Sequence, residues 1–361
     1  MKMTRYMTLL ILAAFIIAAR TNAAVGEWYA VTIYPLVSCA LSFAVSRIPF
    51  SMEEMLVVGT GIIIIVLAIR GIIQKRLKTI FIIAEIIIWA IIWFYLGWGM
   101  NYFRESIYSR GKIERQQFEE DIFEKFLQDY ADNLNGSYVE MPENLEYDDF
   151  AADIKERYEK VPAQYGLSEP KSWQNPKNLI FNRLYSAVGV VGYIGPFFSE
   201  IQVNEDVLPG QKAFSYAHEL SHLLGVSNED EANFWAYQIC RHSNIPEVRY
   251  SGYYSLLPYV LSNASRILSE DEYKEYQRQI RPEILQQLID QQNYWKARYS
   301  KTLGEIQSRM YDAMLKGNKI SSGTKNYMQV IDLIIATEYS VQKETIKTLA
   351  TKTLSNVAGD I

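Results

Sequence analysis

Apolar residues are concentrated at the start of this chain. Three strongly apolar runs cover residues 7–19, 55–69 and 79–100, and the second and third are rich in isoleucine. With their flanking residues, these two runs are long enough to cross a bilayer core of about 30 Å. Beyond residue 100, charged residues recur throughout and no similar run follows. This pattern predicts a membrane region over residues 1–100 and a globular domain over residues 101–361.

The connection between the second and third runs is short and carries four cations, namely Arg70, Lys75, Arg76 and Lys78. Short cytoplasmic loops of membrane proteins are enriched in Lys and Arg. We therefore expect the third run to cross outward, which makes the domain after residue 100 extracytoplasmic. Within this run, Glu85 would be costly as an isolated ion, so we expect it to be protonated, packed between helices or close to the cytoplasmic end.

Two apolar segments leave the topology open. Residues 1–23 fit either a first transmembrane helix or a signal peptide, because residues 21–23 resemble a small-residue cleavage site. Both interpretations leave residue 24 outside the cytoplasm. Residues 29–45 are also apolar, but if they crossed the bilayer the cationic loop would face outward. We expect them to form a helix that lies on the membrane surface or is partly inserted.

The domain after residue 100 has mixed periodicity. Residues 188–208 are rich in β-branched and aromatic side chains and are interrupted by glycine and proline, which is typical of short strands. Helical patterns cover residues 101–131, 147–161, 253–269, 270–281, 282–315 and 327–349. We therefore expect an α+β fold that is mostly α, with N-terminal transmembrane helices, a small sheet and a helical C-terminal half.

Residues 218–222 form an HExxH motif in a chain that has only three histidines. Four residues are about one helical turn, so His218 and His222 leave the same helix face and can share one Zn²⁺. Glu219 can then reach a water molecule on the metal and accept its proton. Gly225 is suited to end this helix. The spacing predicts a zinc metallopeptidase site, and the alternative is an ordinary amphipathic helix with two hydrogen-bonded histidines.

A third zinc ligand must come from outside this helix, because one helix face cannot surround a tetrahedral ion. Glu229 and Glu231 are both candidates, and on a helix they would point in widely different directions. Residues 229–233 resemble the E-x-x-A-D/N signature of gluzincin peptidases. That resemblance implies Glu229 as the zinc ligand and Asn233 as the partner that supports a ligating histidine. The metzincin pattern also matches as far as Gly225, but its third histidine falls on Asn228, a poor zinc ligand.

Two further features are candidates for substrate handling. Tyr253, in the tyrosine-rich stretch of residues 250–254, could stabilise an oxyanion, although simple packing is the alternative. In zincin peptidases an edge strand near the HExxH helix binds the substrate backbone by strand addition. Residues 199–204 are the candidate for that strand, with a buried core strand as the alternative.

Composition and charge argue against some classes of binding partner. The net charge of −5 and the lack of a basic stripe or phosphate-binding glycine loop argue against a nucleic-acid partner. Cys39 and Cys240 lie in different regions, so no disulfide framework is implied. His242 lies at an expected helix end, where an interaction with the helix dipole is the simplest role. The remaining partners are the lipid bilayer and a peptide or protein substrate.

Over nearly its full length, the chain resembles a bacterial family of membrane proteins of unknown function, domain of unknown function 3810. The shared features are Pro-Phe-Ser at residues 49–51, Gly-Pro-Phe at residues 195–197 and Glu-x-Glu-Ala-Asn at residues 229–233. The resemblance implies a bacterial inner or plasma membrane location. It implies no substrate.

Together these features predict a membrane-anchored, gluzincin-like zinc metalloendopeptidase that acts outside the cytoplasm. His218, His222 and Glu229 would hold Zn²⁺, and Glu219 would act as general base. One alternative is a membrane sensor or scaffold whose zinc site is structural or inactive. Another is a receptor whose protease domain cleaves a regulator in response to a signal.

Overall fold

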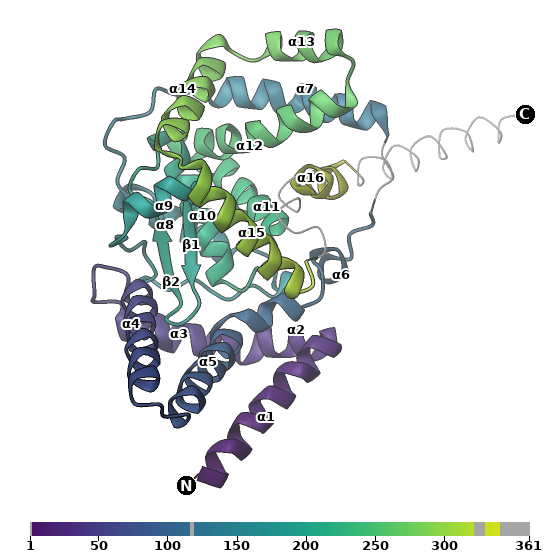
Figure 1. The fold of residues 1–361 in the computed structure, drawn as a ribbon. Helices are drawn as coiled ribbons and strands as arrows, with labels where there is room; N and C mark the ends of the chain where they lie inside the picture. Colours follow the sequence, from purple (N-terminus) through teal and green to yellow (C-terminus); the bar gives the residue numbers. More distant parts are fainter. Residues whose placement is uncertain (1, 116–118, 321–328, 340–361) are drawn as a thin grey trace, which may run out of the picture.

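The computed structural model describes residues 2–115, 119–320 and 329–339, and it is mostly helical with one small sheet (Figure 1). The N-terminal helices are α1 (Lys2–Thr21), α2 (Ala23–Thr32), α3 (Tyr34–Val45), α4 (Met52–Ile73) and α5 (Lys78–Gly97). The next elements are η1 (Gly99–Phe103), α6 (Ile107–Gly111), α7 (Glu120–Ser137), η2 (Tyr147–Asp149), α8 (Ala151–Glu159), η3 (Ala163–Tyr165), α9 (Asn182–Val188), β1 (Gly192–Gly195) and β2 (Glu200–Val203). The last are α10 (Pro209–Leu223), α11 (Glu229–Arg241), α12 (Pro246–Ile267), α13 (Glu270–Gln279), α14 (Pro282–Arg298), α15 (Lys301–Gly317) and α16 (Val330–Glu338).

Three of these helices, α1, α4 and α5, are long and apolar enough to span a membrane. They extend from the same end of the molecule, while α2 and α3 run across their upper ends, beneath the remaining helices (Figure 1). Together α2 and α3 are also long and apolar enough to cross a membrane, but the pair is bent by 44°. Tyr34 and Ser42 on α3 are buried, whereas Leu36 and Phe43 are exposed. This one-sided burial is what a helix lying along a membrane surface needs.

Glu85 in α5 forms an ion pair with Arg5 in α1. Arg5 Nε lies 2.7 Å from Glu85 Oε1, and a second guanidinium nitrogen donates to Oε2 at 2.7 Å. An ion pair reduces the cost of placing a carboxylate within a membrane helix. At the other end of α1, Ala19 is fully buried and Arg20 donates to the carbonyl of Gly317 at 2.8 Å. Helix α1 is therefore joined to the rest of the protein at both ends.

The core of the domain is a group of three mutually packed helices, α10, α11 and α12, with α7, α8 and α16 against them. Helix α10 is buried on nearly all sides, because small and apolar residues occupy most of its length. Such a helix occupies the centre of a domain. Its fully buried side chains are Ala213, Tyr216, Ala217, Leu220 and Ser221.

The sheet consists of two antiparallel strands, with Gly192 opposite Val203 and Gly195 opposite Glu200. All four residues of β2 are buried. Glu200 accepts hydrogen bonds from the backbone N–H groups of Met52 and Glu53, at 3.3 and 3.0 Å. The structure therefore places residues 199–204 in the interior, as a core strand. Strand β1 is only partly buried and is the strand that borders a cavity.

Two long helices expected from the sequence are divided in the structure. The first, residues 101–131, is replaced by η1, α6 and α7, because Arg104 is extended and Lys112 adopts a left-handed conformation. The second, residues 282–315, is broken before α15, where the Ser300 N–H donates to the Ala187 carbonyl at 2.8 Å. Hydrophobic periodicity reflects local structure alone, so it cannot predict this hydrogen bond between distant residues. Of the last expected helix, only α16 lies within the described residues.

The first turn of α4 is joined to the loops around the sheet. Glu53 accepts a hydrogen bond from the Phe197 N–H at 3.0 Å, and Glu54 accepts from the Ile180 and Phe181 N–H groups at 2.6 and 3.1 Å. Ser51 caps the helix by accepting from the Glu54 N–H at 3.1 Å. The apolar helices and the sheet therefore pack as one body, and the domain boundary expected at residue 100 remains a prediction.

Candidate metal centre

The HExxH segment lies in α10, as its spacing predicts. The helix ends at Leu223, and Gly225 follows with φ +102°, a conformation that favours glycine. The carbonyl of Gly225 accepts a hydrogen bond from Arg104 at 2.9 Å. This turn reverses the chain so that the first residue of α11, Glu229, returns to the face that carries both histidines.

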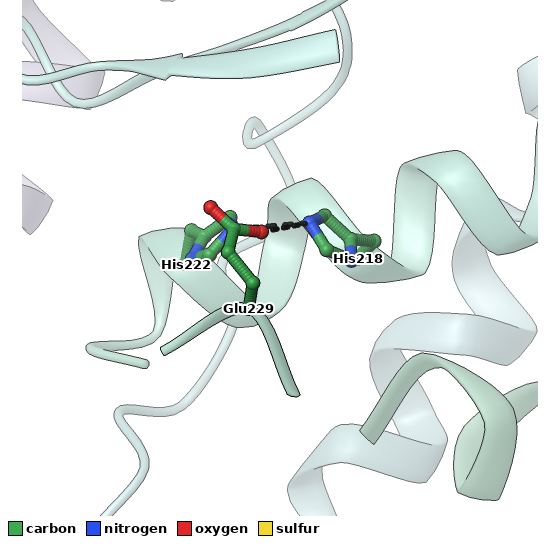
Figure 2. A group of neighbouring side chains, drawn as sticks. All are labelled: His218, His222 and Glu229. Carbon is green, nitrogen blue, oxygen red and sulfur yellow. Dashed lines mark hydrogen bonds and ion pairs between the residues drawn. The ribbon is translucent and has the colours of Figure 1, made fainter. Parts of the chain in front are cut away.

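His218, His222 and Glu229 converge on one point (Figure 2). The two Nε2 atoms are 3.1 Å apart. Glu229 Oε2 lies 3.1 Å from His218 Nε2 and 3.4 Å from His222 Nε2. Among the described residues, this is the one group of three or more His, Cys, Asp or Glu side chains arranged closely enough to hold a metal ion.

Hydrogen bonds on the far side of each ring set the orientation of the imidazoles. His218 Nδ1 lies 2.9 Å from Asn233 Oδ1, and His222 Nδ1 lies 2.8 Å from the Val226 carbonyl oxygen. Both oxygens accept, so each Nδ1 carries the hydrogen, and in the neutral rings each Nε2 presents a lone pair. Two lone pairs and a carboxylate oxygen at these separations need a cation or a proton between them.

The geometry fits zinc. A tetrahedral zinc ion with bonds of about 2.0–2.1 Å separates its ligand atoms by about 3.3 Å. The three observed separations are 3.1, 3.1 and 3.4 Å. Two neutral imidazoles and one carboxylate are also a zinc ligand set that leaves a fourth position open. The residues that are present therefore suit a bound Zn²⁺.

Protons compete for the same position. Burial lowers the pKa of His222, but the Glu229 carboxylate more than offsets this and raises it to about 9. Burial by itself would raise the pKa of Glu229, yet the two histidines hold it well below its usual range. Without metal, a proton shared near these residues is therefore favoured at neutral pH.

The two candidate carboxylates have different partners. Glu231 is buried against Arg110, and one guanidinium nitrogen lies 2.6 Å from each carboxylate oxygen. The indole of Trp235 also donates to Glu231 at 3.2 Å. Glu231 is thus held away from the histidines, and Glu229 is the carboxylate that faces them.

Glu219 lies in the same cavity wall as the histidines and is only 5% exposed. Burial raises its pKa to about 7, although both histidines oppose this shift. Strand β1 passes close to it, since a Cβ added at Gly192 would lie 2.7 Å from Glu219 Oε1. The lack of a side chain at position 192 leaves the room that this carboxylate occupies.

The cavity beside the four residues has a volume of about 680 Å³, within the range typical of ligand sites. Its walls come from β1 and the preceding loop, from α10 and α12, from the C-terminal end of α5 and from α15. The apolar lining consists mainly of Phe94, Trp98, Tyr102, Val188, Val190, Val191, Tyr193, Ile194, Phe214, Tyr259 and Met314.

The structure places Tyr253 outside this cavity, in an aromatic cluster with Tyr130 and Tyr237. Tyr259, on the same helix, lines the cavity instead. Sequence reasoning also missed Tyr311 on α15, whose hydroxyl donates to Glu229 Oε1. No motif marks Tyr311, because it comes from a helix that is distant in sequence. His242 ends α11, with Nδ1 2.8 Å from the Gln238 carbonyl, as expected for a helix terminus.

Comparison with known proteins gives a family and no activity. No curated protein and no protein of solved structure matches this chain. One family, described as "Protein of unknown function (DUF3810)", matches residues 29–335. The match includes α4, α5, the sheet and the histidine-bearing helix. The chain therefore belongs to the DUF3810 family of proteins of unknown function.

Proposed function

We propose that this protein is a membrane-anchored, zinc-dependent endopeptidase of gluzincin type. The observation that carries the proposal is the convergence of His218, His222 and Glu229, with separations of 3.1–3.4 Å, beside the buried carboxylate of Glu219. These residues border a cavity of about 680 Å³. The cationic loop at residues 70–78 supports an extracytoplasmic position for the residues that follow α5.

Each residue has a defined task in this proposal. His218, His222 and Glu229 would hold the ion, and Asn233 would orient His218. When bound, Zn²⁺ lowers the pKa of a water molecule and polarises the scissile carbonyl. Glu219 takes the proton from the attacking water and returns it to the leaving amine. Its buried position in the cavity wall beside the histidines is suited to both transfers.

Strand β1 supplies a place for the substrate backbone. Its one strand partner among the described residues is β2, which lies on its buried side. The residues of β1 that line the cavity are Gly192, Tyr193 and Ile194. A substrate in extended conformation can add to such an edge through main-chain hydrogen bonds. This would bring a peptide bond alongside Glu219, which packs against Gly192.

A structural zinc site in a sensor or scaffold is the competing interpretation. Structural zinc sites are normally closed by four protein ligands. Within the described residues, three ligating side chains gather here, next to a cavity. This arrangement favours catalysis over a purely structural role.

The test uses the full chain in detergent, where no bilayer limits access to the cavity. Metal content is measured by mass spectrometry, and cleavage is followed with an unbiased peptide library. We expect one zinc per chain, peptide cleavage, and loss of cleavage with retained zinc in Glu219→Gln. Zinc without cleavage would instead support the structural site, and a chain that binds no zinc would refute the proposal.

A further inference from the structure

Resting on the proposed function, we infer that the substrate is the juxtamembrane segment of another membrane-spanning polypeptide. The scissile bond would lie within about three to six residues of the membrane surface, since an extended chain advances about 3.3 Å per residue. The inference follows from how the cavity, the metal ligands and α5 are joined.

The cavity is built partly from a candidate membrane span. Phe94 and Trp98, in the last turn of α5 and just after it, line the same cavity as His218 and Glu219. The indole of Trp98 donates to the backbone carbonyl of His222 at 2.9 Å. Its ring also packs edge-on against the His222 imidazole, with centroids 6.1 Å apart. One side chain therefore separates the end of the span from a metal ligand.

Trp93 on α5 has the surroundings of a residue at the membrane surface. This side chain is 43% exposed, and its indole donates to the Phe197 carbonyl at 3.0 Å. Tryptophan with one polar contact and one exposed apolar face is typical of the bilayer interface. From Trp93 to Trp98 the helix advances about 7–8 Å. Adding the 6.1 Å between the Trp98 and His222 ring centroids, an extended chain needs about four residues to cover the same distance.

The wall of the cavity is also fixed in position relative to the spans α4 and α5. A Cβ at Gly97 in α5 would collide with the Pro196 carbonyl oxygen, so α5 is in direct contact with the turn that follows β1. The Phe197 N–H bonds to Glu53 at the start of α4. Strand β1, which ends at Gly195, is therefore fixed relative to both α4 and α5. The Gly-Pro-Phe segment at residues 195–197 is the point of attachment.

An exposed apolar patch borders this region, formed by Phe50, Ile180, Phe181 and Leu184, which are between 41% and 53% exposed. Glu54 on α4 holds the backbone N–H groups of Ile180 and Phe181. Tyr185, the next residue after Leu184, lines the cavity. A patch of this kind beside a span is suited to the headgroup region of a bilayer.

The experiment compares two probes in vesicles of phosphatidylethanolamine and phosphatidylglycerol that contain the full chain. Both probes carry the same transmembrane helix and the same cleavable segment, selected from the peptide library in detergent. In one probe the segment begins about four residues from the helix, and in the other a proline-rich spacer of about twenty residues precedes it. Both probes are confined to the membrane equally, so only the height of the segment differs.

We expect the near probe to be cleaved at least about tenfold faster in vesicles. The spacer holds the cleavable segment of the other probe away from the cavity, which lowers the effective concentration of that segment there. The two probes should be cleaved equally in detergent. Equal rates in vesicles would overturn the inference while leaving the peptidase function intact.

Photocrosslinking gives a readout that does not depend on activity. In the Glu219→Gln chain, a benzoylphenylalanine replaces Phe94, or replaces the exposed Ile289 on α14 as a control at the end of the molecule remote from the spans (Figure 1). We expect crosslinks to the near probe from position 94 and none from position 289. If the library yields no cleaved segment, the peptidase proposal fails, and both probes then carry one arbitrary extended segment for the crosslinking alone. Absent or equal crosslinking of the two probes at position 94 would then overturn this inference as well.

Discussion

The Tyr311 hydroxyl donates a hydrogen bond to Glu229 Oε1, while Oε2 of the same carboxylate faces both histidines. Helix α15 thus fixes the orientation of the proposed third zinc ligand from the opposite wall of the cavity. Hydrogen-bond partners of metal ligands hold the ligand in its binding rotamer, and their loss weakens metal affinity.

Tyr311→Phe removes this hydrogen bond and leaves the ring in place. We expect zinc affinity, measured by competition with a chromogenic chelator, to fall by about 10- to 100-fold. Met310→Leu is the matched control, because Met310 is 69% exposed on the same helix. Equal affinities for the Tyr311→Phe and control chains would show that α15 does not orient Glu229.

Asn233→Leu should act on the histidine side of the same centre. Without the acceptor at 2.9 Å from His218 Nδ1, the ring loses its orientation, and zinc affinity should fall by about 10- to 100-fold. Asn233→Asp keeps the acceptor and should retain binding. His242→Ala, at the exposed end of α11, serves as the control for loss of a histidine outside the site. Unchanged affinity in Asn233→Leu would contradict the role assigned to this amide.

Gly192→Ala tests the contact between β1 and the proposed general base. Its Cβ would meet Glu219 Oε1 at 2.7 Å, so the carboxylate or the strand must shift. Displacement of a catalytic group by about 1 Å lowers rates by about 100-fold. We expect such a loss in peptide cleavage with unchanged zinc content. Gly136→Ala, which meets nothing within 4 Å, is the control. Full activity of Gly192→Ala would show that Glu219 needs no such space.

The pH dependence of zinc binding has a defined sign. In the metal-free protein the pKa of His222 is raised to about 9. Protonation of His222 therefore stabilises the folded chain. This contribution is complete below the unfolded pKa of about 6.5 and is lost as pH rises through 9. Zinc must displace this proton. Its affinity should therefore rise about tenfold per pH unit between about 6.5 and 9. Isothermal titration calorimetry in buffers of different ionisation enthalpy would show proton release, and a pH-independent affinity would contradict the arrangement.

Helix α1 should be retained in the mature protein. Cleavage after residue 23 would leave Glu85 without Arg5 and would remove the contact between Arg20 and Gly317. We expect the intact mass of the membrane-extracted protein to include residues 1–23. Arg5→Leu should lower thermal stability more than the Arg5→Leu/Glu85→Leu double variant does, since the single change leaves an uncompensated charge. A mass that corresponds to cleavage would refute the prediction.

Much of the fold follows from local patterns. The apolar runs predicted the three candidate spans, because run length and hydropathy alone set whether a helix can cross a bilayer. The predominance of helix and the presence of a small sheet were also predicted correctly. Gly225 ends α10 as expected, since a left-handed turn favours glycine wherever it occurs.

Other features depended on contacts between distant residues. The separation of α14 from α15 rests on a hydrogen bond to Ala187, and periodicity within residues 282–315 contains no trace of it. Glu200 of β2 accepts hydrogen bonds from the first turn of α4, and β2 lies in the interior, whereas Gly192, Tyr193 and Ile194 of β1 line the cavity. Strand β2 carries the polar residues Glu200 and Gln202 although all four of its residues are buried, so local polarity does not identify the buried strand.

For the candidate site, the sequence by itself determined which side chains can share a helix face. The HExxH spacing placed His218, Glu219 and His222, because helical periodicity is a local property. The tertiary structure decided the roles of the other candidate residues. Glu231 forms an ion pair with Arg110, Glu229 faces the histidines, and Tyr253 lies in the core. It also brought Trp98 and Tyr311 to the centre from α5 and α15. Contacts between residues more than 80 positions apart arise from packing of whole helices, which no local pattern encodes.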